Sequence, residues 1–268
     1  MKSRYRQVLA DIRAAVRLGG LEDLEAAFAG LMDLPEIASN HRISEAVLKQ
    51  LLVPAGELLA GQAAARLEPL TEHPLAGVRA VGAAALAARF TRRKDVSLKR
   101  LGRAAGDNRP EVRQALIDVL GRLGSENPQV LRLAVERWLS ATSPRLRETA
   151  ARLLPVLAES EGEAVLKRFN ALREESHPEV RAALTDALRA TAERGLDAAV
   201  LRWLRSWADS PQPDDWLIAR TLAGAWGAQH PQESADILRA LYARRGLSRP
   251  VRQALEALAR RGVEIRLD

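Results

Sequence analysis

Apolar residues recur along this chain at the spacing that one face of an α-helix requires. After the proline at position 110, Val112, Leu116 and Leu120 stand four residues apart. The same stripe returns at Leu146, Ala150 and Leu154, at Val180, Leu184 and Leu188, and in a weaker form at Val78, Gly82 and Leu86. Apolar positions at i, i+4 and i+8 predict helices that each bury one face.

Each stripe follows a short motif that marks a helix start. The clearest copies are Pro110–Glu111–Val112–Arg113 and Pro178–Glu179–Val180–Arg181, with looser copies at Pro144, Pro74 and Pro250. Proline suits the first helical position, because that N–H has no partner in the helix and the fixed φ is already helical. The motif arginines Arg79, Arg113, Arg147 and Arg181 are separated by 34, 34 and 34 residues. A fixed period of this size predicts a stacked repeat array.

A second register at nearly the same period lies between these helix starts. It consists of Leu98–Lys99, Leu131–Arg132, Leu166–Lys167, Leu201–Arg202 and Leu238–Arg239. Each unit therefore contains two helices, and neither can bury its stripe without a neighbouring unit. We expect an all-α fold, a right-handed α-solenoid (superhelix) of stacked antiparallel helix pairs with a period of about 34 residues and about six or seven pairs.

The first quarter of the chain is helical in pattern but irregular. We expect helices over residues 3–18 and 21–32, a loop over 36–42, a helix capped by Ser44 that runs through Leu52, and, after Pro54, a helix from about 56 to 67. Terminal repeats of solenoids are usually atypical. Residues 1–70 are therefore predicted to form an N-terminal cap continuous with the solenoid, and residues 71–268 to form the repeats.

The motif Asp107–x–x–Pro110–x–Val112–Arg113–x–Ala115 and its copies resemble HEAT repeats over roughly residues 70–262. The resemblance implies that the motif arginines, with Arg252 and Arg220 as further members, bond turn carbonyls and acids between units. Asp107 is the one clear repeat aspartate; Ser140–Ala141, Glu175 and Leu247 stand near the other matching places. The resemblance also implies that the protein is an interaction platform. The alternative role for these arginines is a cationic stripe that tracks a phosphate backbone.

Composition removes several classes of chemistry. The chain is 47% hydrophobic and 28% charged and has no cysteine, which excludes disulfides, zinc–thiolate sites, thiolate-held iron–sulfur clusters and cysteine nucleophiles. No apolar run approaches the length of a membrane span, and no phosphate-binding Gly loop, zinc-protease motif or nucleophile elbow is present. We expect a cytoplasmic protein, monomeric, without metal or cofactor.

The charge is basic, at +7 with a sequence pI near 10.4, which favours polyanionic partners. Cations cluster in one segment, and a solvated turn and a phosphate-facing patch are both open interpretations of it. The candidate binding residues of this segment are Arg89, Arg92, Arg93, Lys94, Lys99, Arg100 and Arg103.

A second cluster is aromatic. We expect Trp203 and Trp207 one turn apart on one helix, Trp216 and Trp226 on the next helix, and Asp214 and Asp215 in the Pro-rich loop between these helices. Core packing explains at least two of these rings, while a pocket lined by tryptophan and acids is the alternative.

The segments Asp215–Trp216–Leu217–Ile218–Ala219–Arg220 and Leu247–Ser248–x–x–x–Arg252–x–Ala254 resemble those of the alkylpurine DNA glycosylases built from HEAT-like repeats. That resemblance implies a base-binding pocket in which Asp214 or Asp215 supplies a catalytic carboxylate. The adjacent tryptophans followed by aspartate that those enzymes carry in mid-chain are absent here.

The sequence as a whole favours a non-catalytic repeat scaffold that binds a macromolecular partner, a protein or peptide, on its concave surface. The alternative is a basic DNA-binding protein related to the HEAT-like glycosylases.

Overall fold

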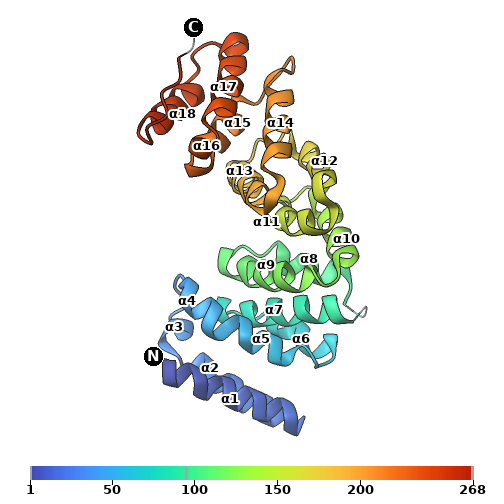
Figure 1. Ribbon diagram of the computed structural model, residues 1–268. Coiled ribbons are helices and arrows are strands. Elements are labelled where there is room, and N and C mark those ends of the chain that lie inside the picture. The colour runs from blue at the N-terminus through green and yellow to red at the C-terminus, as the bar shows by residue number, and fades with distance from the viewer. Residues whose placement is uncertain (1, 94–95, 267–268) are drawn as a thin grey trace. The chain divides into compact units, whose positions relative to one another are not determined.

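The structure, a computed structural model, describes residues 2–93 and 96–266 (Figure 1). This part of the chain consists of helices joined by short turns and contains no strand. None of its helices combines the length and the apolar character that crossing a membrane needs. The chain divides into two compact units, residues 1–149 and 150–268, and each is described by itself below.

The first unit begins with α1 (Lys2–Leu18) and α2 (Leu21–Met32), and both helices match their predicted bounds. A short helix, α3 (Pro35–Ala38), replaces part of the expected loop. The Ser44 hydroxyl accepts a hydrogen bond from the backbone N–H of Val47 at 3.3 Å, which confirms the predicted cap of α4 (Glu45–Val47). A π-helical stretch η1 (Leu48–Leu52) then continues into α5 (Val53–Leu59).

The helix predicted over residues 56–67 is wrong. Pro54 lies in the first turn of α5, directly after the π-helical η1, and α5 ends at Leu59. The chain turns at residues 60–63 before α6 begins at Ala64. The apolar pattern crossed this turn, so the pattern alone joined two helices into one.

Beyond this point the described residues form six consecutive helix pairs, which confirms the all-α solenoid class. The pairs are α6 (Ala64–Thr71) with α7 (Ala76–Arg92), α8 (Leu98–Ala105) with α9 (Pro110–Gly124), α10 (Pro128–Leu139) with α11 (Pro144–Glu161), α12 (Leu166–Phe169) with α13 (Pro178–Thr191), α14 (Asp197–Ala208) with α15 (Asp215–Leu222), and α17 (Pro231–Arg245) with α18 (Arg249–Ala259). We call α6, α8, α10, α12, α14 and α17 the first helices and their partners the second helices. Whether residues 1–70 are a distinct cap stays a prediction.

Four further short elements complete the second unit. The 3₁₀ turns η2 (Gly162–Val165) and η3 (Asn170–Leu172) flank α12, the π-helical η4 (Ala192–Leu196) precedes α14, and α16 (Ala225–Gln229) lies between α15 and α17. Trp226 was expected on the same helix as Trp216, and that expectation is wrong. Gly224 is extended and starts α16 as a separate helix. A Cβ at Gly227 would stand 1.9 Å from the Leu222 carbonyl oxygen, so only glycine permits this close return of the chain.

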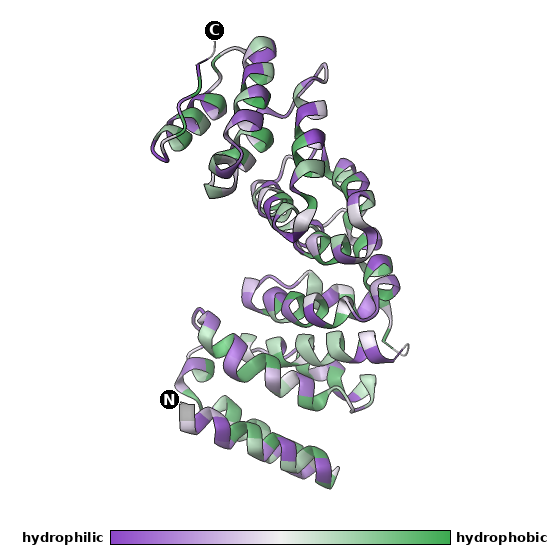
Figure 2. Cartoon of the chain, viewed as in Figure 1, coloured by the Kyte–Doolittle hydropathy of each residue, from purple (hydrophilic) through white to green (hydrophobic). Residues whose placement is uncertain are grey.

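The centre of the first unit is α7, which is mostly light green in Figure 2 because alanines dominate it. It packs against α5, α6 and α9, so that nearly all of its side chains are buried. A Cβ at Gly56 would lie 2.5 Å from the Ala84 Cβ, and one at Gly82 would lie 2.8 Å from the Leu70 Cβ. Small residues are thus required here because three helices approach α7 closely.

The motif arginines tie each turn to the helix that follows it. The Nη1 group of Arg79 donates to the carbonyl oxygens of His73 and Pro74, both at 2.9 Å. Arg147 does the same with Ala141 and Thr142, at 2.9 and 2.8 Å. Because these acceptors precede each arginine by six and five residues, the bonds recur with the repeat.

The same arginines also reach acids of the next unit. Arg79 donates to Asp107 at 2.9 and 3.3 Å, and Arg181 donates to Asp214 at 2.7 Å. Arg113 donates to Glu148 at 2.7 Å, and both side chains are less than a tenth exposed. These contacts confirm the structural interpretation for three arginines, while Arg220 and Arg252 are exposed.

We expect Arg113→Met to lower the free energy of unfolding by about 3 kcal/mol, because it removes the guanidinium that neutralises the buried Glu148 carboxylate. The control is Arg132→Met, an exposed arginine of α10, whose effect should stay within about 0.5 kcal/mol. Urea unfolding followed by circular dichroism measures both. Equal effects of the two substitutions would contradict a stabilising role for the Arg113–Glu148 pair.

A carboxylate on α9 predicts a pH effect. Burial raises the pKa of Asp118, although Gln114 donates to its Oδ1 at 2.7 Å and opposes the rise, as the charge of Lys49 does. Its Oδ2 is buried and has no hydrogen-bond partner among the described residues. The folded state therefore binds this proton more tightly than the unfolded chain, so the carboxyl costs stability as the pH rises through the raised pKa.

Asp118→Asn should accordingly raise the free energy of unfolding at pH 7 by about 1 kcal/mol, because no charge is then buried. The gain should shrink as the pH falls through the raised pKa and vanish below the ordinary aspartate pKa, where the wild-type group is neutral in both states. Thermal melts of both proteins from pH 7 to pH 3 test this. A gain that does not depend on pH would rule out the charge as its cause.

Candidate binding surfaces

Two of the four clustered tryptophans pack between α12 and α14 of the second unit. Trp203 and Trp207 lie one turn apart on α14 with ring centroids 4.6 Å apart, and Trp203 meets Phe169 of α12 edge-on at 6.0 Å. Trp207 is 4% exposed. The Arg173 guanidinium carbon lies 5.2 Å from the centre of the Trp207 ring. These ring contacts hold α12 against α14.

Trp226 lies apart from that pair. Its indole N–H donates to Asp197 at 2.8 Å, and its ring centroid lies 5.4 Å from that of His230. The Trp226 hydrogen bond lowers the pKa of Asp197, with further help from His230, whose Nε2 is 3.3 Å from the carboxylate. This contact fastens α16 to the start of α14.

Trp216 has a third location, where the Arg181 guanidinium carbon lies 4.6 Å from its ring centre. The structure thus distributes the four tryptophans over three places. A pocket lined by tryptophan and acids, the alternative interpretation, is therefore not shared by all four rings.

Asp214 is a repeat aspartate. Its Oδ1 accepts from the backbone N–H of Leu217 at 3.0 Å, which caps α15, and also from Arg181. It precedes Arg220 by six residues, as Asp107 precedes Arg113. That spacing was the signal that could have identified it from the sequence. Asp215 lies half-buried in the first turn of α15.

The basic segment is less free than its sequence suggests. Arg89 is 5% exposed and donates to the carbonyl oxygens of Ala60 and Gly61 at the end of α5, both at 3.3 Å. Its expected place among surface residues is therefore wrong, because the end of a helix needs donors for its last carbonyls. Arg92 and Arg93 are exposed at the end of α7. Lys94 lies outside the described residues.

Acids of α6 neutralise part of the remainder. Arg103 lies 3.1 Å from Glu68 and 3.0 Å from Glu72, and Arg100 lies 3.1 Å from Glu68. Lys99 is exposed. Lys99 and Arg103 share a hollow of about 710 Å³ between α8 and α10 with Arg137 and the edge of Trp138. Arg137 was not among the predicted binding residues, although it follows Arg103 by 34 residues, one repeat period.

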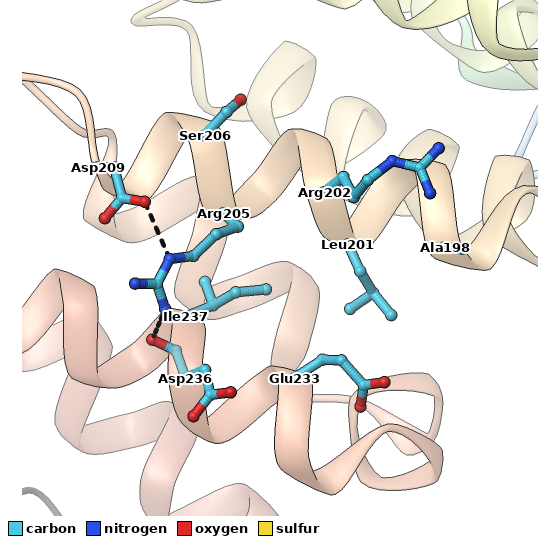
Figure 3. Close-up of a pocket in the computed structure, with 9 residues that line it drawn as sticks. All are labelled: Ala198, Leu201, Arg202, Arg205, Ser206, Asp209, Glu233, Asp236 and Ile237. Carbon is cyan, nitrogen blue, oxygen red and sulfur yellow. Dashed lines mark hydrogen bonds and ion pairs between the residues drawn. The ribbon is translucent and has the colours of Figure 1, made fainter.

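A groove of about 580 Å³ lies between α14 and α17 (Figure 3). Leu201 and Ile237, both buried, lie between the two helices. None of its residues was among the binding residues that the sequence predicted. The lining is Ala198, Leu201, Arg202, Arg205, Ser206, Asp209, Glu233, Asp236 and Ile237.

The charged rim of this α14/α17 groove is internally paired on its α14 side. Arg205 donates to Asp209 at 2.9 Å and to the Asp236 carbonyl oxygen at 2.6 Å, and both bonds are drawn in Figure 3. Arg202 donates to Glu163 at 2.7 Å. The Glu233 carboxylate is exposed on the opposite side. An apolar floor with a polar rim is the usual anatomy of a protein-binding surface.

Nothing in the described part of the chain gathers three or more His, Asp or Glu side chains in a way that could hold a metal ion.

The helix pairs and the arginine contacts define a helical-repeat protein. Residues 63–155, from α6 into α11, match the family model for HEAT repeats, so this segment consists of HEAT repeats. No curated protein matches the chain. The crystal structure of an engineered protein is similar at 19% identity and a TM-score of 0.30, over 92% of this chain and 98% of that chain. The resemblance to DNA glycosylases finds no support in these comparisons.

The structural role of Asp214 can be separated from that of Asp215. Asp214→Asn should keep the helix cap but weaken the partly buried pair with Arg181, at a cost of about 1 kcal/mol in the free energy of unfolding. Asp215→Asn should cost only about 0.5 kcal/mol, through the helix dipole. Denaturant titration measures the free energy of unfolding of both variants. A larger loss of stability for Asp215→Asn than for Asp214→Asn would contradict the structural role given to Asp214.

Proposed function

We propose that this protein is a non-catalytic HEAT-repeat scaffold that binds a segment of a protein partner. One observation carries the proposal: the groove between α14 and α17 pairs a floor of Leu201 and Ile237 with a polar, solvent-facing rim. Repeat arrays present extended surfaces of this kind. The position of the partner on a concave surface, a cytoplasmic location and a monomeric state stay predictions.

The contacts that the charged and aromatic candidate side chains make within the protein also support a scaffold. Asp214 caps a helix, Arg79, Arg113 and Arg181 bond across repeats, and Trp207 is core. Residues that would have to act on a substrate are thus engaged in holding the repeats together.

Nucleic acid is the second candidate partner. The hollow between α8 and α10 favours it, because Lys99, Arg103 and Arg137 line one surface there. Against it, Arg103 is already paired with Glu68 and Glu72, so fewer charges remain to release counterions from a phosphate backbone.

Affinity capture from a lysate of the source cells, with and without nuclease, tests the scaffold. We expect the immobilised wild type to retain a protein after nuclease treatment, and Ala198→Arg, which fills the groove from an exposed position, to retain about tenfold less. Ala243→Arg is the matched control, because Ala243 is an exposed alanine of α17 outside the groove lining.

Two results would contradict the scaffold proposal. Retention of nucleic acid alone, lost with nuclease, would favour the second candidate. Equal retention by Ala198→Arg and the wild type would remove the α14/α17 groove as the binding site.

A further inference from the structure

A second groove of the second unit, between α15 and α18, differs in chemistry from the one between α14 and α17. It has a volume of about 440 Å³ and lies between two second helices that pack directly against each other. Short side chains line it on both sides: Ala219 on α15, Ala223 directly after α15, and Ala254 and Ala257 on α18. The short side chains leave an open trough where larger ones would have filled the contact.

Arginines gather along this trough. Arg220 lines it from α15, and Arg260 and Arg261 line it from the end of α18; all three are exposed. Arg261 donates to the Ala257 carbonyl oxygen at 3.0 Å, which fixes its direction. Glu256 is the one acid in the lining, and no ion pair joins Arg220 or Arg260 to an acid among the described residues.

A fourth arginine bonds the end of α15, the helix from which Arg220 lines the trough. Arg189 of α13 donates to the carbonyl oxygens of Thr221, at 3.0 Å, and of Arg220, at the end of α15. Gly224 leaves room for it, since a Cβ there would stand 3.3 Å from its Cζ. Burial lowers the pKa of Arg189, the charges of Arg220 and Arg261 lower it further, and Asp186 and Glu193 oppose this. Arg189 thus lies close enough to Arg220 and Arg261 to be affected by their charges.

Trp216 forms an aromatic wall of the trough. Arg181 covers its ring at 4.6 Å, and the side chain remains half-exposed. A partner with both carboxylates and apolar groups fits such a wall better than a simple ion does. Guanidinium groups bind carboxylates through paired, charge-assisted hydrogen bonds.

We propose that the α15/α18 groove binds an acidic segment of a protein partner, with its carboxylates on Arg220 and Arg260 and an apolar side chain against Trp216. The inference rests on the proposed scaffold function and names the chemistry of its partner.

The charges around the trough favour a peptide over a nucleic acid. A nucleic-acid strand carries a charge about every 3.4 Å, so it would have to pass Glu256 in the lining and the acids Asp186 and Glu193 near Arg189. An acidic peptide places two or three carboxylates on the arginines and can leave other positions neutral.

Fluorescence anisotropy with a short labelled peptide, in which Asp and Glu alternate with Leu and Gly, measures the interaction. The test variant is Arg220→Gln with Arg260→Gln. The control is Arg244→Gln with Arg245→Gln, two exposed arginines of α17 outside the groove, so that both proteins lose the same charge. We expect the test variant to bind the peptide at least about tenfold more weakly, and the control to bind within about twofold of the wild type.

Three outcomes would overturn the inference: no peptide binding by the wild type, equal losses in the two variants, or tighter binding of a single-stranded oligonucleotide of equal charge. The last would assign the groove to nucleic acid. Failure of the scaffold proposal looks different, because peptide binding would persist while the lysate yields no groove-dependent protein. Conversely, capture that Arg220→Gln with Arg260→Gln leaves intact, without peptide binding, removes the acidic-segment inference alone.

Discussion

The apolar stripe of a repeat helix needs a neighbouring repeat to bury it, so the structure depends on the contact between successive repeats. The motif arginine secures that contact. Arg79 bonds the turn before its own helix and Asp107 in the following repeat, so one side chain fixes both the helix start and its neighbour. Arg113 uses Glu148 where the sequence offers no acid at the equivalent of Asp107. A guanidinium with several donors allows this exchange of partners, because the acid can come from the turn or from the next helix.

The repeats were predictable because their determinants are local: a proline at the helix start, a stripe at every fourth residue, and a period of 34. Where the structure differs from the prediction, the cause is a tertiary contact, which no local sequence pattern contains. Residues 56–67 carry a helical pattern, yet the chain turns at 60–63. Trp226 leaves the helix of Trp216 because Gly227 packs on the Leu222 carbonyl group. The alanine-rich α7, a weak stripe in the sequence, proves to be the most enclosed helix of its unit, since three helices need to approach it.

Candidate surface residues were harder to predict for a related reason. In a solenoid the spatial neighbour of a side chain lies about one period away. Arg103 meets Glu68, which is 35 residues earlier, and shares its hollow with Arg137, which is 34 residues later. A run of cations along the sequence therefore overstates the charge at a surface, as Arg89 shows by bonding carbonyl oxygens inside the unit. Comparing positions one repeat apart would have paired Arg103 with Arg137, and the six-residue spacing to Arg220 would have identified Asp214 as the equivalent of Asp107.

The same reasoning changes the meaning of the net charge of +7. Within the second unit, the groove between the first helices α14 and α17 has three acids and two arginines in its lining, and both arginines are paired with acids. The groove between the second helices α15 and α18 has three arginines and one acid. Electrostatic complementarity contributes more to the choice and orientation of a partner than to raw affinity. The two grooves of the second unit therefore differ in charge, and the net charge of the chain describes neither of them.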